Sequence, residues 1–100
     1  MQKSASTRRR SEEEKQVAAF GHAIYLLRIK SSLSQEELAF RSDVGRSYVG
    51  VLERGEKEPC LGVIFRLAKA LGISLLDVFT LTEQLYKDGY KRAPRNARVR

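Results

Sequence analysis

The stretch SQEELAFRSDVGRSYVGVLERG, residues 34–55, constrains the fold of this chain more than any other feature. It places two short helical patterns on either side of a four-residue turn. Two short helices that cross steeply touch only where a small residue lies at the crossing, and Ala39 meets this need. Leu38, Val49 and Leu52 then face the remaining core. The stretch therefore predicts a helix pair that packs against further helices.

The boundaries of this pair carry residues suited to caps and to unusual backbone angles. Ser34 is placed to cap the first helix, with Glu37 in the capping-box position. Asp43 tolerates the left-handed conformation that the turn needs, although Gly would adopt it at lower cost. Gly55 suits a left-handed cap after the second helix. These signals bound the pair between Ser34 and Gly55.

A first helix is predicted before this pair. Ser11 and the three Glu residues after it form a cap and a capping box, so we expect the helix to begin near Glu12. It should end around Ser31 and Ser32. Its core stripe, at spacings of three and four residues, is Val17, Phe20, Ile24 and Leu27.

Two more helices are predicted after the pair. One follows Pro59 and ends at Gly72, and the last begins at Leu75 after the cap Ser74. Their inward apolar residues are Leu61, Ile64, Leu67, Ala68 and Leu71, then Val78 and Phe79. Since no strand-like alternation occurs, we predict an all-α fold. Its five helices form one domain over residues 11–89, between a basic flexible arm at 1–10 and a basic flexible tail at 90–100.

Length and cysteine content narrow the class of protein. One hundred residues allow a single small domain, and the single Cys60 forms no internal disulfide, which favours a reducing compartment. No apolar run approaches the length of a membrane span, and SEEEK places acid where a signal peptide needs a basic flank. We therefore expect a cytoplasmic protein without membrane association.

The net charge of +7 lies at the two ends of the chain. Residues 1–10 hold four basic side chains and residues 90–100 hold five, with no acid in either segment. Residues 11–89 hold ten basic and twelve acidic side chains, a net charge of −2. A nearly neutral body with two basic arms fits a polyanionic partner, because flexible cations follow phosphates without a preformed groove. The alternative is that the basic ends only aid solubility.

The outer face of the third predicted helix has no partner in the core. Its residues share one helical face and combine charge, a hydroxyl and small apolar groups: Arg46, Ser47, Gly50, Val51 and Arg54. A helix with such a face fits the major groove of double-stranded DNA.

Several motifs at matching offsets resemble the Cro/lambda-repressor type of helix-turn-helix, the XRE family of regulators. They are LSQEELA at 33–39, RSYVGVLERG at 46–55, Pro59, and LAKALGISLLDVF at 67–79. The resemblance implies a five-helix, lambda-repressor-like DNA-binding domain in which helices 2 and 3 form the helix-turn-helix. It also implies a buried ion pair between Arg28 and Glu53, which ties helix 1 to the end of helix 3.

Within this resemblance, reach and chemistry assign roles on DNA. Arg46, near the start of helix 3, is the candidate for guanine readout, since its planar fork donates twice to O6 and N7. Ser47 suits a base donor or acceptor, and Val51 a thymine methyl. Gln35 is the candidate for a phosphate contact that fixes the register of the protein on DNA. The other candidates for contacts with DNA are Ser34, Gly45, Tyr48, Gly50, Arg54 and Lys57.

Three of these assignments keep an alternative. Tyr48 either reaches a phosphate or base edge, or packs partly beneath helix 2. Gly50 either allows close approach of the backbone to DNA or is merely tolerated, at a cost of about 1 kcal/mol relative to Ala. For Lys57, a solvated loop position competes with a phosphate contact. Gly45 replaces the Ser or Thr that normally caps the recognition helix in this family.

Exposed apolar residues predict a homodimer. Tyr25, Leu26 and Ile29 form a second apolar patch on helix 1, opposite its core stripe. The end of helix 5 offers the contact candidates Leu81, Leu85 and Tyr86. The alternative is that this C-terminal segment folds back over helix 1 within one chain.

The sequence thus predicts a DNA-binding transcription regulator, most simply a repressor, that binds an inverted-repeat operator as a homodimer. A prophage-type repressor and a restriction-modification controller both fit. One alternative is an antitoxin or adaptor whose main partner is an unidentified protein. Another is sequence-independent coating of nucleic acid by the basic arms. No catalytic motif, metal-ligand cluster or cofactor-binding loop is present, and the lone His22 reads as a surface side chain, so we expect neither an enzyme nor a cofactor.

Overall fold

A computed structural model describes residues 5–90 of the chain. These residues form the helices α1 (Ala5–Lys30), α2 (Gln35–Ser42), α3 (Arg46–Glu53), α4 (Leu61–Leu71) and α5 (Leu75–Lys87). No strand occurs among them, so the predicted all-α class is confirmed. Residues 1–4 and 91–100 lie outside the described part, and with them most of the predicted C-terminal tail. Within residues 5–90, no helix is both long enough and apolar enough to cross a bilayer.

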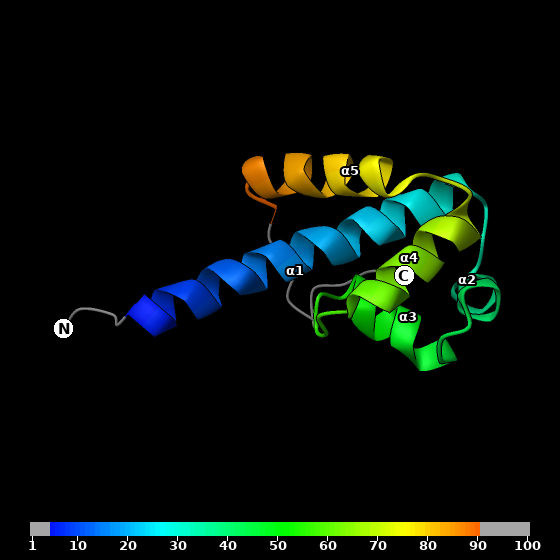
Figure 1. Ribbon diagram of the computed structural model, residues 1–100, viewed down its shortest axis with the longest axis horizontal. Helices are drawn as coiled ribbons and strands as arrows, with labels where there is room; N and C mark the ends of the chain where they lie inside the picture. Colours follow the sequence, from blue (N-terminus) through cyan, green and yellow to red (C-terminus); the bar gives the residue numbers. More distant parts are fainter. Residues whose placement is uncertain (1–4, 91–100) are drawn as a thin grey trace.

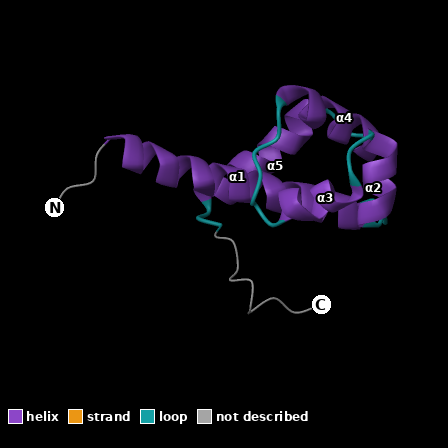
Figure 2. Cartoon of the chain, turned by 90° about the horizontal axis from the view of Figure 1, so that it is seen from below, coloured by secondary structure: helices purple, strands orange, loops and turns teal. Residues whose placement is uncertain are grey.

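The first helix begins earlier than predicted. It starts at Ala5 rather than near Glu12, and Ser11 lies inside it instead of capping it. The segment before Ser11 contains neither Gly nor Pro and includes three Arg residues, which favour helix, so the helix continues through the predicted cap. Figures 1 and 2 show that the N-terminal end of α1 extends beyond the other helices.

The predicted caps of α2 and α5 are confirmed. Ser34 Oγ accepts from the Glu37 amide at 3.0 Å, and the Ser34 amide donates to Glu37 Oε1 at 2.8 Å. The backbone amide of Asp77 donates to Ser74 Oγ at 3.0 Å. Asp43 ends α2 with a φ of 57°, the left-handed conformation expected for this turn.

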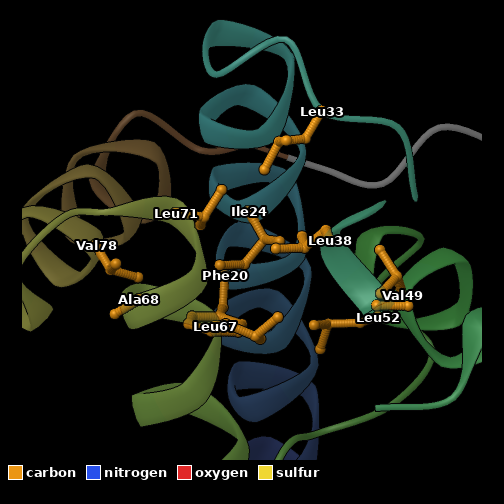
Figure 3. Packing of buried hydrophobic residues seen from close by; sticks show 11 residues of the cluster. Phe20, Ile24, Leu33, Leu38, Val49, Leu52, Leu67, Ala68, Leu71 and Val78 are labelled. Atoms are coloured by element: carbon orange, nitrogen blue, oxygen red, sulfur yellow. The ribbon is translucent and has the colours of Figure 1, made fainter. Parts of the chain in front are cut away.

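The hydrophobic core lies where the helices meet α1 (Figure 3). Its buried members are Phe20, Ile24, Leu33, Leu38, Ala39, Val49, Leu52, Leu67, Ala68, Leu71 and Val78. Two predicted inward residues are wrong. Leu61 is 63% exposed because it occupies the first position of α4, and Phe79 is 41% exposed although its ring centroid lies 6.3 Å from that of Phe20.

The longest helix has a different neighbour on each side. Figure 1 shows α5 running antiparallel to α1 on one side, with α3 and α4 on the other. α5 and α3 both pack against α1. On the α3 side the backbones approach closely, because a Cβ atom at Gly21 would lie only 2.1 Å from the Leu52 carbonyl oxygen. Gly21 is therefore required at this crossing.

Candidate nucleic-acid interface

The outer face of α3 is formed by residues at its N-terminal end. Arg46 and Ser47 are exposed, and Val51, one turn later, is half-buried. Val49 and Leu52 turn the opposite face into the core. Gly45 precedes the helix as its N-cap, in extended conformation and without a side-chain cap. The predicted readout residues Arg46, Ser47 and Val51 thus belong to one solvent-facing side of a helix anchored by its other side.

Arg46 is held by an acid of the neighbouring helix. Its Nε atom lies 3.1 Å from Glu36 Oε2, and the two side chains are 78% and 65% exposed. Ion pairs this exposed contribute about 0–1 kcal/mol, so the pair orients Arg46 without fixing it. Sequence reasoning missed Glu36. The signal that points to it is an acid at the second position of α2, across the turn from the start of α3.

A buried ion pair joins α1 to the end of α3. Arg28 Nε lies 2.6 Å from Glu53 Oε2, and its Nη2 donates to Glu53 Oε1 at 2.9 Å. Arg28 Nη1 also donates to the Leu33 carbonyl oxygen at 2.9 Å. Hydrogen bonding to Glu53 raises the pKa of Arg28 above its ordinary value. The pair that the family resemblance implies is therefore present, and it also fixes the loop that leads into α2.

Gln35 joins this network, which sequence reasoning did not foresee. Its Nε2 donates to Glu53 Oε1 at 2.9 Å. The first residue of α2 is thus linked to the last residue of α3 and, through it, to α1. Ser34, next to it, is exposed, and its hydroxyl group still has a proton to donate while its oxygen serves the cap.

Gly50 is buried, which corrects its predicted place on the exposed face. It lies beneath the side chains of Gln35 and Arg54, whose polar ends come within 4 Å of where its Cβ atom would be. Arg54 is half-buried, with its Nε atom 3.3 Å from Glu56 Oε2. Neither close approach of the Gly50 backbone to DNA nor simple tolerance of glycine describes this arrangement. The side chains that cover Gly50 come from the start of α2 and from the residue after α3.

The ring of Tyr48 packs against the hydrophobic core. Burial raises the pKa of its hydroxyl group, and the nearby Cys60 raises it further. The packing alternative therefore describes Tyr48 better than a base contact. Lys57 is exposed in the loop between α3 and α4, and Cys60 is an exposed free thiol.

One side chain outside the helix-turn-helix, His22, differs from expectation. His22 is half-buried rather than a plain surface residue, with its ring 4.3 Å from that of Tyr90 and nearly parallel to it. Burial lowers its pKa. Within the described residues, no three His, Cys, Asp or Glu side chains cluster as metal ligands would.

The predicted dimer contacts lie on α5, which covers α1 in the single chain. Leu81, Leu85 and Tyr86 are half-buried, and the Tyr86 hydroxyl donates to a Glu12 carboxylate oxygen. The apolar side chains of α5 that remain most exposed are Leu76, at 73%, and Phe79. One face of α5 is therefore used within the chain, and another is left open.

Known proteins share this fold and much of its sequence. The helix-turn-helix family model matches residues 24–78. The control protein C.BamHI of Bacillus amyloliquefaciens is 39% identical over 64 residues, which span 63% of this chain and 79% of that protein.

Two solved structures are similar. The restriction-modification controller protein C.AhdI from Aeromonas hydrophila superposes with a TM-score of 0.62 at 44% identity, over 63% of this chain and 96% of that one. The clp gene regulator ClgR from Corynebacterium glutamicum superposes with a TM-score of 0.70 at 30% identity, over 72% and 77%. Since the family match spans more than half of the residues and includes α2, the turn and α3, this chain belongs to the helix-turn-helix family of the Cro/lambda-repressor (XRE) type, whose members are DNA-binding transcription regulators and not enzymes.

Proposed function

We propose that this protein binds an inverted-repeat operator as a homodimer, with α3 in the major groove and Arg46 reading a guanine. The exposed end of α3 carries this proposal. Arg46 is highly exposed there, Ser47 is beside it, and the rest of the helix is fixed by the core. A guanidinium group in this place donates twice to guanine O6 and N7 once it leaves Glu36, and the exposed ion pair costs little to break.

Contacts to phosphates would set the register of α3 in the groove. Gln35 and Ser34 start α2, and Arg54 and Lys57 follow the other end of α3. Although these positions are far apart in the sequence, the polar ends of Gln35 and Arg54 both come within 4 Å of the Gly50 Cβ position, so their donors lie on the same side of α3. The Gly45 amide, at the start of α3, is a further donor to phosphate. Tyr48 contributes less to these contacts, because its ring packs against the core.

The dimer would form through the open face of α5. Leu76 and Phe79 are exposed there, and Tyr25, Leu26 and Ile29 are exposed on α1, which packs against α5. Exposed apolar side chains on paired helices favour a contact surface. The predicted contacts Leu81, Leu85 and Tyr86 follow them along α5 and are half-buried in the single chain. Sedimentation equilibrium at micromolar concentration, with and without operator, checks this, and a monomer in both conditions would contradict it.

The relatives favour a particular regulatory setting. C.BamHI and C.AhdI are named as control proteins, and C.AhdI as a restriction-modification controller. We propose the same role here, in the cytoplasm, with repression as its simplest mode. ClgR is named for clp genes, so the alternative is a regulator of other genes. A restriction endonuclease or methyltransferase gene beside the bound operator would support the controller role.

Selection of bound sequences from random duplexes tests the proposal as a whole. We expect a palindrome whose half-sites lie about one helical turn apart, because the two-fold symmetry of a dimer is mirrored in its site. Arg46→Ala should then weaken binding at that site by about 1–3 kcal/mol and relax the preference at one base position per half-site. Equal weakening on all sequences would make Arg46 a phosphate contact.

Arg46→Lys is the matched control. It keeps the charge and loses the planar fork, so base preference should relax while the salt dependence of affinity stays unchanged. The cluster Arg8, Arg9 and Arg10 at the exposed start of α1 is a separate case. If it binds phosphates, its replacement by Ala should make the slope of log affinity against log salt shallower, by about 0.9 for each phosphate that is no longer neutralised, without changing base preference.

A further inference from the structure

Two polar side chains cross α3 directly above Gly50. A Cβ atom at this position would lie 3.3 Å from Arg54 Nη1, and 3.6 and 3.7 Å from the amide oxygen and nitrogen of Gln35. One of these side chains belongs to the first residue of α2, and the other follows the last residue of α3. Both groups therefore border the space that a side chain at position 50 would occupy.

The orientation of the Gln35 amide is set from below. Glu53 Oε1 accepts from Gln35 Nε2 at 2.9 Å, and the same oxygen accepts from Arg28 Nη2. An ionised carboxylate only accepts, so the NH₂ group and not the carbonyl oxygen of Gln35 must face Glu53. One of the two amide hydrogens is used in this bond, and the other is left as a donor in a known direction. The buried ion pair thus fixes the orientation of a group on the surface.

Arg54 supplies the complementary charge. Its Nε atom lies 3.3 Å from Glu56 Oε2, while its Nη1 atom, like the Gln35 amide, comes within 4 Å of the Gly50 Cβ position. A guanidinium group next to an amide donor is a favourable pair of groups for a phosphate oxygen, because the first supplies charge and a planar fork and the second a directed hydrogen bond.

We propose that Gln35 and Arg54 grip one DNA phosphate together, that Gly50 provides the clearance for this, and that Glu53 is the positioning residue for the Gln35 amide. This rests on the proposed function, in which α3 enters the major groove. It adds a reason for a glycine in the middle of the recognition helix and a second task for the buried ion pair.

Nothing in the fold itself demands glycine at this position. Gly50 lies inside α3 and does not have a positive φ, unlike Gly55, Gly72 and Gly89. Its would-be neighbours are the far ends of flexible side chains and not backbone atoms. Alanine also favours a helix interior over glycine. Gly50→Ala should therefore leave the fold intact, displace the end of the Arg54 side chain and bring the new methyl group into contact with Gln35.

The experiment compares Gly50→Ala with Gly62→Ala in the full chain, on the operator found by selection. Gly62 also lies inside a helix, but its Cβ atom would meet only Arg66 Nη1, at 3.9 Å. Both variants should unfold at or above the temperature of the unchanged protein. Gly50→Ala should bind the operator about fivefold more weakly, the effect of one impaired hydrogen bond to a charged group. Its salt slope should become shallower, and that of Gly62→Ala should stay the same.

A double variant tests whether Gly50 acts through Gln35. If it does, Gly50→Ala and Gln35→Ala together should weaken binding less than the product of the two single effects. Losses that multiply, or Gly50→Ala binding with unchanged affinity and slope, would overturn the inference and leave the proposed function intact. If selection yields no preferred duplex for the unchanged protein, the proposed function itself fails. A lowered unfolding temperature of Gly50→Ala would also overturn the inference, because the glycine would then serve the fold.

Discussion

The two sides of α1 are packed in different ways. Toward α3, backbone meets backbone: Gly21 lies against the Leu52 carbonyl, and a Cβ atom at Gly55 would lie 2.9 Å from Ala18 Cα. The Arg28–Glu53 pair is buried on the same side. Toward α5, contact is made by side-chain ends, with the rings of Phe20 and Phe79 tilted at 39°. Of α5, Val78 is the buried residue.

This difference matches the demands on the two helices. Backbone contacts and buried charges have few alternative arrangements, so α3 is held in one orientation relative to α1. Rings at the ends of side chains can adjust, and α5 keeps exposed apolar surface. The packing between α1 and α3, the helix proposed to read DNA, therefore fixes one orientation. The packing between α1 and α5, the helix proposed to contact a second chain, allows side chains to adjust.

Breaking the ion pair should produce the largest effect on stability. Glu53→Ala leaves Arg28 buried without its counter-charge, which typically costs about 3–5 kcal/mol. Urea unfolding monitored by circular dichroism measures the loss. Arg28→Met combined with Glu53→Leu removes both charges and should cost far less. If the single and double variants were equally unstable, packing and not charge would hold this side.

Gly21→Ala should come next, at about 3 kcal/mol, because its methyl group meets the Leu52 carbonyl with no flexible side chain to give way. Gly72→Ala separates crowding from backbone strain. Gly72 has a φ of 72° and open space around it, so alanine there should cost only about 1 kcal/mol. Equal losses in chemical denaturation would mean that α1 and α3 shift apart easily.

Phe79→Ala tests the contact between α1 and α5. It should lower the free energy of unfolding of a single chain by only about 1–2 kcal/mol, since the ring is already partly exposed. Its main effect should be a higher dissociation constant of the dimer in sedimentation equilibrium. Thr80→Ala, at an exposed neighbouring position, is the control. A Phe79→Ala variant that unfolds as easily as Gly21→Ala but dimerises normally would reverse the contrast between the two sides.

The smallest effect concerns pH and the segment that follows α5. Burial lowers the pKa of His22 below its ordinary 6.5, so the folded protein favours the neutral ring. The stability linked to this group is present above pH 6.5 and is lost as the pH falls through 6.5 toward the lower folded value. His22→Gln should flatten the dependence of unfolding free energy on pH in this range. An identical curve for both proteins would show that burial of the His22 ring leaves its protonation unaffected.

Features set by neighbouring residues were predictable from the sequence. Ser34, Ser74 and Asp43 take their expected roles because a cap or turn depends on a few adjacent positions. The start of α1 was predicted wrongly even though its signals are local. The capping box at Ser11 favours a helix start there, but the preceding residues also favour helix, and the helix continues through them. The Arg28–Glu53 pair followed from family resemblance and not from any pattern in this chain.

The missed features depend on distant segments. Gln35 and Glu53 are separated by 18 positions, and no periodicity connects them. Gly50 has the right spacing for the exposed face, but side chains from α2 and from the end of α3 cover it. From the sequence alone, Gly21 only lowers the helix propensity of its segment, and its role in the close crossing with α3 is not visible. Helical periodicity therefore predicts which side of a helix a residue occupies, but not which side chains from other segments cover it.

Because α1 is one continuous helix, it holds the Arg8–Arg10 cluster at a fixed distance from the rest of the domain. At about 1.5 Å per residue, Arg9 lies about 28 Å along the helix axis from Arg28, which is shorter than one turn of duplex DNA at about 34 Å. A coil of the same number of residues would sample many separations, whereas a helix keeps one. Any phosphate that this cluster meets would lie at a set offset from the recognition helix, so lengthening α1 by one residue would move the cluster both outward and around the axis.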